Sequence, residues 1–142
     1  MKRRMVSLLL AMVILAVVLP QTSSAAEAEH FSPVRTYHGQ FVDIDTSDWY
    51  YQNVTALYEL GLTDGQGSTD LFSPSSDVTI AELLTMAARL RSLYEYGDSE
   101  KGPSAYQDAH SWYLPYVEYL QSLTIISTEF EEQYSQPATR AQ

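Results

Sequence analysis

The sequence predicts a mainly α-helical protein built from tandem helix-loop-helix repeats, and three observations support this prediction. A Trp-Tyr pair occurs twice, at residues 49–50 and 112–113, which are 63 positions apart. A Thr-x-Ala-x motif also occurs twice, at residues 79–82 and 139–142, which are 60 positions apart. Between these landmarks, apolar residues recur at spacings of three and four, the period of an amphipathic helix. Two landmarks with nearly the same period indicate an internal repeat.

The first predicted helix follows residue 48. Ser47 or Asp48 can cap its N-terminus by accepting a backbone N–H. One apolar face is formed by Tyr50, Val54, Leu57 and Tyr58. Gly61 is able to adopt the left-handed conformation that ends a helix, and Leu62 behind it can fold back on the last turn. The next segment, 63–70, contains two glycines and no apolar residue, so we expect a solvated loop.

The second predicted helix opens with a capping box, in which Thr79 and Glu82 bond each other's backbone N–H groups. Its apolar stripe is expected to consist of Leu83, Met86 or Ala87, Leu90 and Tyr94. The segment 95–104 contains two glycines and a proline and is interpreted as a linker.

The second unit repeats this order. A helix is predicted from Ser111, where Pro115 falls in the opening turn and is tolerated. Thr124 stands where Gly61 stands in the first unit, so we expect this helix to end differently. The last four residues repeat the capping-box pattern, from which we expect an incomplete second repeat and a longer protein.

The N-terminus has the pattern of a secretory signal peptide. Three basic residues precede a short apolar run and a small-residue exit, and cleavage fits after Ala26 or after Ala28. The alternative, an uncleaved anchor, is disfavoured because the run is shorter than the roughly 20 residues that a span needs. We therefore expect an exported protein without a stable membrane span. The chain has no cysteine, which excludes a lipid anchor on cysteine and any disulfide.

The charge balance excludes one class of partner. The chain has 8 basic and 18 acidic residues, and three of the basic residues lie in the signal segment. The strongly acidic remainder would be repelled by nucleic acid and by anionic membranes, because binding to phosphate depends on basic side chains.

Several of these motifs occur together in one known family. Phe-x-Asp at 41–43, Trp-Tyr at 49–50, Gly-Leu-Thr at 61–63, Phe-x-Pro at 72–74 and Thr-x-Ala-Glu at 79–82, partly repeated after residue 105, resemble the S-layer homology domain family. The resemblance divides the chain into a signal peptide (1–26), a linker (27–40), a first repeat (41–94), a linker (95–104) and an incomplete second repeat (105–142).

The resemblance implies noncovalent anchoring of an exported protein to the bacterial cell wall or surface layer. Such domains usually act in threes around a pseudo-threefold axis and hold acidic, often pyruvylated, secondary cell-wall polysaccharide, or peptidoglycan, in grooves between repeats. The match assigns the family's signature arginine to Arg140. The first unit has Ile80 at that position, which keeps the backbone donors but supplies no charge, so we expect its helix start to be structural.

Five residues are candidates for binding a glycan. Arg140 at a helix start would offer an acidic sugar both a guanidinium and free backbone N–H groups, the alternative being a solvated surface arginine. Trp49 and Trp112 can stack on sugar rings, although tryptophan more often packs at the base of a helix pair. Asp43 and Asp108 can bind sugar hydroxyls or close a turn with their own backbone.

The sequence contains no catalytic constellation. The three histidines lack metal-ligand spacing, and the loop that contains Asp64 and Asp70 lacks the glycine and glutamate of a calcium loop. We expect no metal, no cofactor and no enzyme activity in this stretch. Two alternatives to a pure anchor stay open. The chain can be the leading segment of a secreted enzyme whose catalytic domain follows Gln142, or a surface-layer protein that self-associates without glycan.

Overall fold

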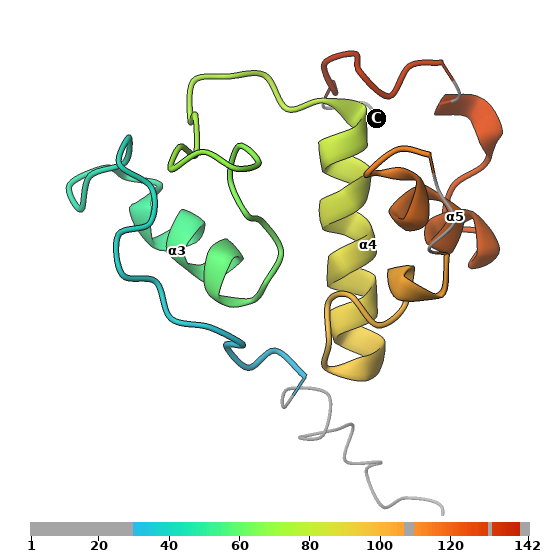
Figure 1. Cartoon of the computed structure of the whole chain (residues 1–142), viewed down its shortest axis with the longest axis horizontal. Helices are drawn as coiled ribbons and strands as arrows, with labels where there is room; N and C mark the ends of the chain where they lie inside the picture. The colour runs from blue at the N-terminus through green and yellow to red at the C-terminus, as the bar shows by residue number, and fades with distance from the viewer. Residues whose placement is uncertain (1–29, 107–109, 131, 140–142) are drawn as a thin grey trace, which may run out of the picture.

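The computed structural model describes residues 30–106, 110–130 and 132–139 (Figure 1). These residues form the helices α3 (Tyr51–Glu59), α4 (Ile80–Tyr96) and α5 (Leu114–Ser122), with the short 3-10 helices η1 (Pro103–Ala105) and η2 (Thr128–Phe130). The prediction of a mainly α-helical fold is confirmed. The signal segment and both possible cleavage sites lie outside the described residues. No helix within the described ranges is long and apolar enough to cross a membrane.

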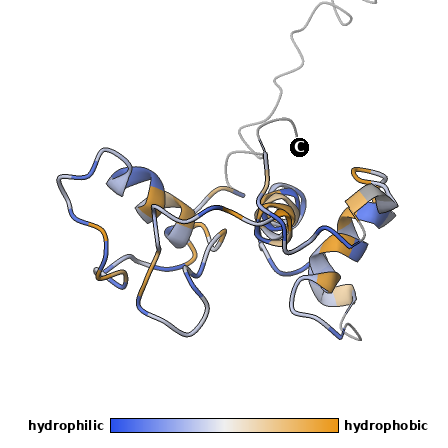
Figure 2. Ribbon diagram, turned by 90° about the horizontal axis from the view of Figure 1, so that it is seen from above, coloured by the Kyte–Doolittle hydropathy of each residue, from blue (hydrophilic) through white to orange (hydrophobic). Residues whose placement is uncertain are grey.

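Helix α4 stands between the other two helices, with α3 on one side and α5 on the other (Figures 1 and 2). Its main packing partner is α5, which belongs to the second predicted repeat. The shared core consists of Ile80, Leu84, Ala88, Val117, Tyr119 and Leu120. After α5 the chain returns across the start of α4, where Thr79 and Pro137 form an isolated antiparallel bridge.

The start of α4 is closed by the chain itself. The predicted capping box is confirmed, because Glu82 N–H donates to Thr79 Oγ1 and Thr79 N–H donates to the Glu82 carboxylate. The Ile80 N–H donates to the carbonyl of Gln136 and the Ala81 N–H to that of Tyr134, both at 2.9 Å. The expected structural role of this helix start is therefore confirmed, but the expectation that it keeps free backbone donors is wrong.

The buried face of α4 is not the predicted one. Leu90 and Tyr94 are exposed, and the helix instead buries Ile80, Ala81, Leu84, Thr85, Ala88, Ser92 and Leu93. Two apolar stripes run along this helix with the same spacing, so the period alone does not choose between them. The stripe with small residues is buried, since Ala88 and Ser92 let neighbouring segments approach closely. The Ser92 hydroxyl donates to the Asp98 carbonyl and accepts from the Gly102 N–H.

Helices α3 and α5 both begin later than expected. Tyr50 and Tyr113 occupy the N-cap positions without a side-chain hydrogen bond, so the predicted cap at Ser47 or Asp48 is wrong. Asp48 closes a tighter turn before the helix, because its carboxylate accepts the Asp45 N–H and its carbonyl accepts the Tyr51 N–H. The predicted position of Pro115 in the opening turn of α5 is confirmed.

The ends of α3 and α5 have the same geometry, although the sequence predicted a difference. Gly61 and Thr124 both have positive φ, at 71° and 57°. The following N–H, of Leu62 or Ile125, donates to the carbonyl of Leu57 or Leu120, which is the pattern of a Schellman C-cap. Thr124 therefore adopts the conformation that glycine usually provides, and the prediction of a different helix end is wrong.

An aromatic cluster covers α3. The N-terminal segment 34–41 runs along this helix, and Val34 N–H donates to the Glu59 carbonyl at 2.9 Å. Rings contact one another with centroids 5.6–6.0 Å apart between Tyr37, Phe41, Tyr51, Tyr58 and Phe72. Helix α3 therefore packs on this aromatic segment, whereas α4 packs on α5.

Candidate functional site

A groove of about 630 Å³ lies where the two predicted units meet. The loops 62–67 and 72–78 of the first unit form one wall, and α4 contributes Glu82, Thr85, Met86 and Arg89. Trp112 and Tyr116 of the second unit complete it. The groove therefore depends on segments from both units.

A second hollow of about 530 Å³ adjoins the first. It is lined by Thr79, Ala81 and Glu82 of the first unit, by Trp112 and Tyr113, and by Glu132, Tyr134 and Ser135. Glu82 and Trp112 border both hollows, so Trp112 stands at their boundary. The site offers aromatic faces beside polar groups, a combination suited to a polyhydroxylated ligand.

The two tryptophans have the same local geometry but different surroundings. Each ring packs edge-on against the next tyrosine, with centroids 5.4 Å apart for Trp49 and Tyr50 and 5.5 Å for Trp112 and Tyr113. Trp49 is 87% exposed and Trp112 is 61% exposed, so the expected packing at the base of a helix pair is wrong. Trp112 lines both hollows, whereas Trp49 lines neither.

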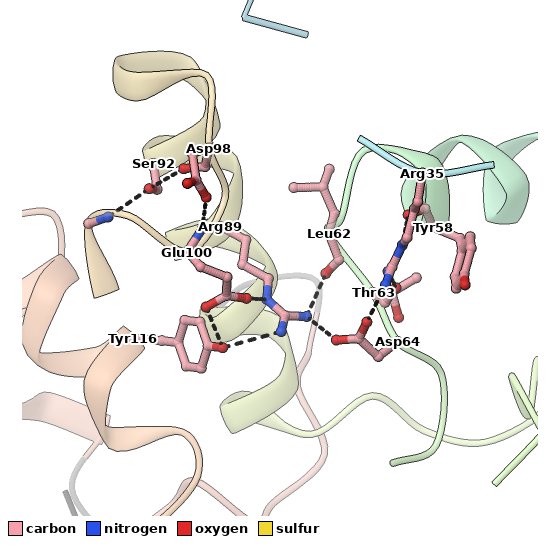
Figure 3. A network of polar contacts seen from close by, with 11 residues as sticks. Arg35, Tyr58, Leu62, Thr63, Asp64, Arg89, Ser92, Asp98, Glu100 and Tyr116 are labelled. Atoms are coloured by element: carbon pink, nitrogen blue, oxygen red, sulfur yellow. Dashed lines mark hydrogen bonds and ion pairs between the residues drawn. The ribbon is translucent and has the colours of Figure 1, made fainter. Parts of the chain in front are cut away.

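A polar network joins the two walls of the groove (Figure 3). The carboxylate of Asp64 bridges two guanidinium groups, with Arg35 at 2.8 Å and Arg89 at 2.9 Å. Arg89 also donates to the Glu100 carboxylate at 2.7 Å and to the Tyr116 hydroxyl at 3.2 Å. The network therefore runs from the N-terminal segment through the first loop and α4 to α5.

The charges of this network determine the protonation of Asp64. Burial is the strongest influence on its pKa and would raise it, but the hydrogen bonds and charges of Arg35 and Arg89 together outweigh burial and hold the pKa below its usual range. Burial would lower the pKa of Arg89, and the interactions with Tyr116, Glu100 and Asp64 outweigh that effect and raise it. Both groups stay ionised at neutral pH, and the guanidinium of Arg89 is already paired.

Asp43 supports the wall of the groove. Its two carboxylate oxygens accept the backbone N–H groups of Phe72 and Ser73 at 2.8 and 2.6 Å. Burial acts to raise the pKa of Asp43, but these backbone donors outweigh it and hold the pKa below its usual range. The interpretation that Asp43 closes a local turn is therefore replaced by a contact across some thirty residues.

Three of the five candidate residues lie in the part of the chain that the structure describes. Of these, Trp112 borders the groove, whereas Trp49 and Asp43 do not. Arg140 and Asp108 lie outside the described residues. Sequence reasoning missed Arg89 and Thr85, which line the groove from α4. One signal was available for Arg89, since an arginine within a largely apolar helix needs an acceptor.

The described part of the groove is acidic. Its lining contains the carboxylates of Asp64, Asp77 and Glu82 against the one guanidinium of Arg89. Asp64 pairs with two arginines rather than facing other metal-ligating side chains. Residues 30–106, 110–130 and 132–139 contain no group of three His, Cys, Asp or Glu side chains placed to hold a metal ion.

Comparison with known proteins identifies one family profile and relatives among secreted enzymes and S-layer proteins. The profile of the S-layer homology domain family matches residues 40–84. An amylopullulanase of Thermoanaerobacterium thermosulfurigenes is 30% identical over 77 residues, or 54% of this chain and 4% of that protein. The exoglucanase XynX of Acetivibrio thermocellus is 29% identical over 97 residues, or 66% of this chain and 9% of that protein.

An S-layer protein of Bacillus thuringiensis subsp. finitimus is 26% identical over 110 residues, or 78% of this chain and 13% of that protein. The chain thus spans only a small part of the length of each of these relatives. No solved structure matches the chain.

Proposed function

Residues 40–84 belong to the S-layer homology domain family, and from this premise we propose that the chain anchors an exported protein to the bacterial cell wall by binding a wall polysaccharide. The protein belongs at the cell surface, as its S-layer relatives do. The observation that carries the proposal is the groove between the two units, with the exposed Trp112 at its edge. The binding event needs no catalysis, and we assign none to this stretch.

The proposed ligand is an acidic secondary cell-wall polysaccharide, such as a pyruvylated one, or peptidoglycan. Trp112 would stack on a sugar ring, because an aromatic face is apolar enough to cover the C–H face of a sugar at a wet surface. Arg140 would bind the acidic group, since a guanidinium forms paired hydrogen bonds with a carboxylate. The proposal gives Asp43 a supporting role, because it holds the backbone of the groove wall at Phe72 and Ser73.

The two tryptophans provide a matched test of the groove. In a pull-down of the full chain with purified wall fragments, Trp112→Ala should reduce retention by about tenfold. This is the loss expected when one stacking contact between an aromatic ring and a sugar ring is removed. Trp49→Ala removes an even more exposed ring, which also packs edge-on against the next tyrosine but lies outside the groove, and should reduce retention much less. Equal losses, or none, would contradict the proposed groove.

A second pair of variants tests the acidic group. Arg140→Ala should weaken retention, and the weakening should fade at high salt because the contact is ionic. Arg91→Ala is the control, since Arg91 is a partly exposed arginine that pairs with Glu95 on the surface of α4. Ile80→Ala is unsuitable as the control, because Ile80 is buried in the core and its truncation would destabilise the fold.

Two further candidates follow from the names of the relatives. The amylopullulanase and the exoglucanase favour an anchor segment of a secreted enzyme. A catalytic domain encoded after residue 142 would support this candidate. The S-layer proteins favour a self-associating surface protein. Walls stripped of their polysaccharide separate this last candidate from the proposal, because self-association survives stripping and glycan binding does not.

A further inference from the structure

Arg89 occupies the point where the two walls of the groove meet α4 (Figure 3). Its Nη1 lies 2.9 Å from the Asp64 carboxylate on the loop wall, and its Nη2 donates to the Tyr116 hydroxyl on α5 at 3.2 Å. Its Nε donates to the Glu100 carboxylate at 2.7 Å. A guanidinium is planar and rigid, so groups bound to its different edges are held at fixed relative positions. The side chain of Arg89 therefore ties one wall to the other.

The guanidinium of Arg89 is used within the protein itself. Each of its three nitrogens already has an acceptor, and the side chain is only 14% exposed. A ligand could bind this group only by displacing a carboxylate, which would leave that carboxylate without its partner. Arg89 therefore acts on a ligand through the position of other groups.

Glu100 takes part in the network from outside the groove, since it borders neither hollow. One of its carboxylate oxygens accepts from Arg89, and the other accepts from the Tyr116 hydroxyl at 2.9 Å. Glu100 thus orients a residue of α4 and a residue of α5 toward each other without lining the groove.

The apolar packing on the two sides of the groove is separate. Helix α3 packs on the aromatic segment before it, and α5 packs on α4. The ion pair between Asp64 and Arg89 connects the loop after α3 to α4, and Tyr116 extends this connection to α5. The polar network therefore determines how far the loop stands from Trp112 on the opposite wall.

We propose that Arg89 is a positioning residue for glycan binding. It sets the separation between the loop 62–67 and Trp112, and Glu100 holds it in the orientation that does so. This inference rests on the proposed function, because it describes how the proposed groove keeps its shape. It implies that binding depends on Glu100, a residue that the glycan does not touch.

Glu100→Ala is the sharpest test, because two effects on binding have opposite signs. Removing a carboxylate from an acidic chain should strengthen the binding of an acidic polysaccharide by long-range attraction. Loss of the positioning contact should instead weaken it by about 3- to 10-fold, since part of the free energy of a hydrogen bond to a charged group is lost. Because Glu100 is about half exposed, the melting temperature should hardly change. Affinity is measured by titrating the full chain with purified acidic secondary cell-wall polysaccharide.

Glu118→Ala is the matched control. Glu118 is exposed on α5, borders neither hollow and is not an ion-pair partner of Arg89. The change removes the same charge and leaves the network in place, so affinity should be unchanged or slightly higher.

A second pair of variants tests the shape of the guanidinium. Arg89→Lys keeps the positive charge but has one nitrogen in place of three, so it cannot reproduce the arrangement that holds both walls. Its affinity should fall by about tenfold. Arg91→Lys makes the same substitution on the same helix, beside Glu95 and outside the groove, and should bind like the unmodified chain. If Arg89→Lys fails to fold, Glu100→Ala carries the test.

The separation of the walls can be measured directly. The chain has no cysteine, so spin labels can be attached at Ser68→Cys in the loop and at Ser122→Cys at the end of α5, both exposed positions. Pulsed electron paramagnetic resonance should give one narrow distribution of distances between the labels. Glu100→Ala and Arg89→Lys should broaden that distribution, and a role in stability alone would not.

Three results would overturn the positioning role while the anchoring function stands. These are unchanged or stronger binding by Glu100→Ala, unchanged binding by Arg89→Lys, and weaker binding by either variant with an unaltered distribution of label distances. If the unmodified chain binds neither the polysaccharide nor whole wall fragments, the proposed function itself fails, and the positioning role with it.

Discussion

Helices α3 and α5 are nearly identical in local structure and differ in what covers them. Both follow an edge-on Trp-Tyr pair and both end in the same C-cap with a residue at positive φ. Yet α5 packs on α4, while α3 packs on the aromatic segment before it. The residue behind each C-cap shows the consequence, because Leu62 is 5% exposed and Ile125 is 51% exposed.

This difference locates the groove. Trp112 meets the first unit across the groove, whereas among the described residues no earlier unit stands opposite Trp49. The same local motif therefore yields a site in one copy and an open surface in the other. A repeat supplies half of a groove, and its neighbour supplies the rest.

The largest expected effect tests the difference in packing. Leu120→Ala should lower the free energy of unfolding by about 3 kcal/mol, because this almost fully buried side chain joins α5 to α4. Leu57→Ala at the equivalent position of α3 should cost about 1–2 kcal/mol, because Leu57 is only partly buried. Denaturant unfolding measures both. Equal costs would mean that the two helices are covered to the same extent.

A smaller effect, of opposite sign in the two units, tests the shared helix ending. Gly61→Ala should cost about 1–2 kcal/mol, because alanine at positive φ is strained and its Cβ would lie 3.0 Å from Ser99 Oγ. Thr124→Gly should stabilise the protein by about 0.5 kcal/mol, since relief of that strain exceeds the added freedom of the unfolded chain. Thermal unfolding reports both signs. A destabilised Thr124→Gly variant would show that the threonine side chain contributes more than its strain costs.

The smallest effect concerns the ion pairs that join the units. The pKa of Asp64 is lower in the folded protein than the value of about 3.9 in an unfolded chain. Its contribution to stability is therefore present above about pH 4 and is lost as the pH falls through the lower folded pKa. Because Asp64 is about half exposed, that contribution should be no more than about 1 kcal/mol.

Unfolding measured at pH 6 and pH 3 checks this expectation. Asp64→Asn should lose less stability on acidification than the unmodified chain. Asp70→Asn is the control, because Asp70 lies in the same loop but is not an ion-pair partner of Arg35 or Arg89. If Asp64→Asn loses as much stability on acidification as the unmodified chain, the network is not a pH-dependent link between the units.

The sequence predicted those features that depend on neighbouring residues. The capping box at Thr79 and the position of Pro115 depend on a few adjacent backbone groups, and both were predicted correctly. The buried stripe of α4 was predicted wrongly, because Leu83 and Leu84 each begin a stripe of helical period and only the position of α5 decides between them. Thr124 was misjudged because its C-cap hydrogen bonds outweigh the local strain of a non-glycine residue at positive φ.

The candidate site shows the same division. Residue type marked Trp112 as a candidate, but nothing in the sequence placed it opposite the loop 62–78 or distinguished it from Trp49. Thr85 and Arg89 gave little signal, because the role of a polar group on a helix depends on which partners surround it.

By itself the sequence determined the helical class, the two-fold recurrence of the Trp-Tyr unit and the match of residues 40–84 to the profile of one family. The tertiary structure alone decided which face of α4 is buried, which tryptophan borders a groove and which arginine ties the walls of that groove together. The physical reason is range: capping and helical period arise within a few residues of the chain, whereas burial and pairing depend on segments brought together from tens of residues apart.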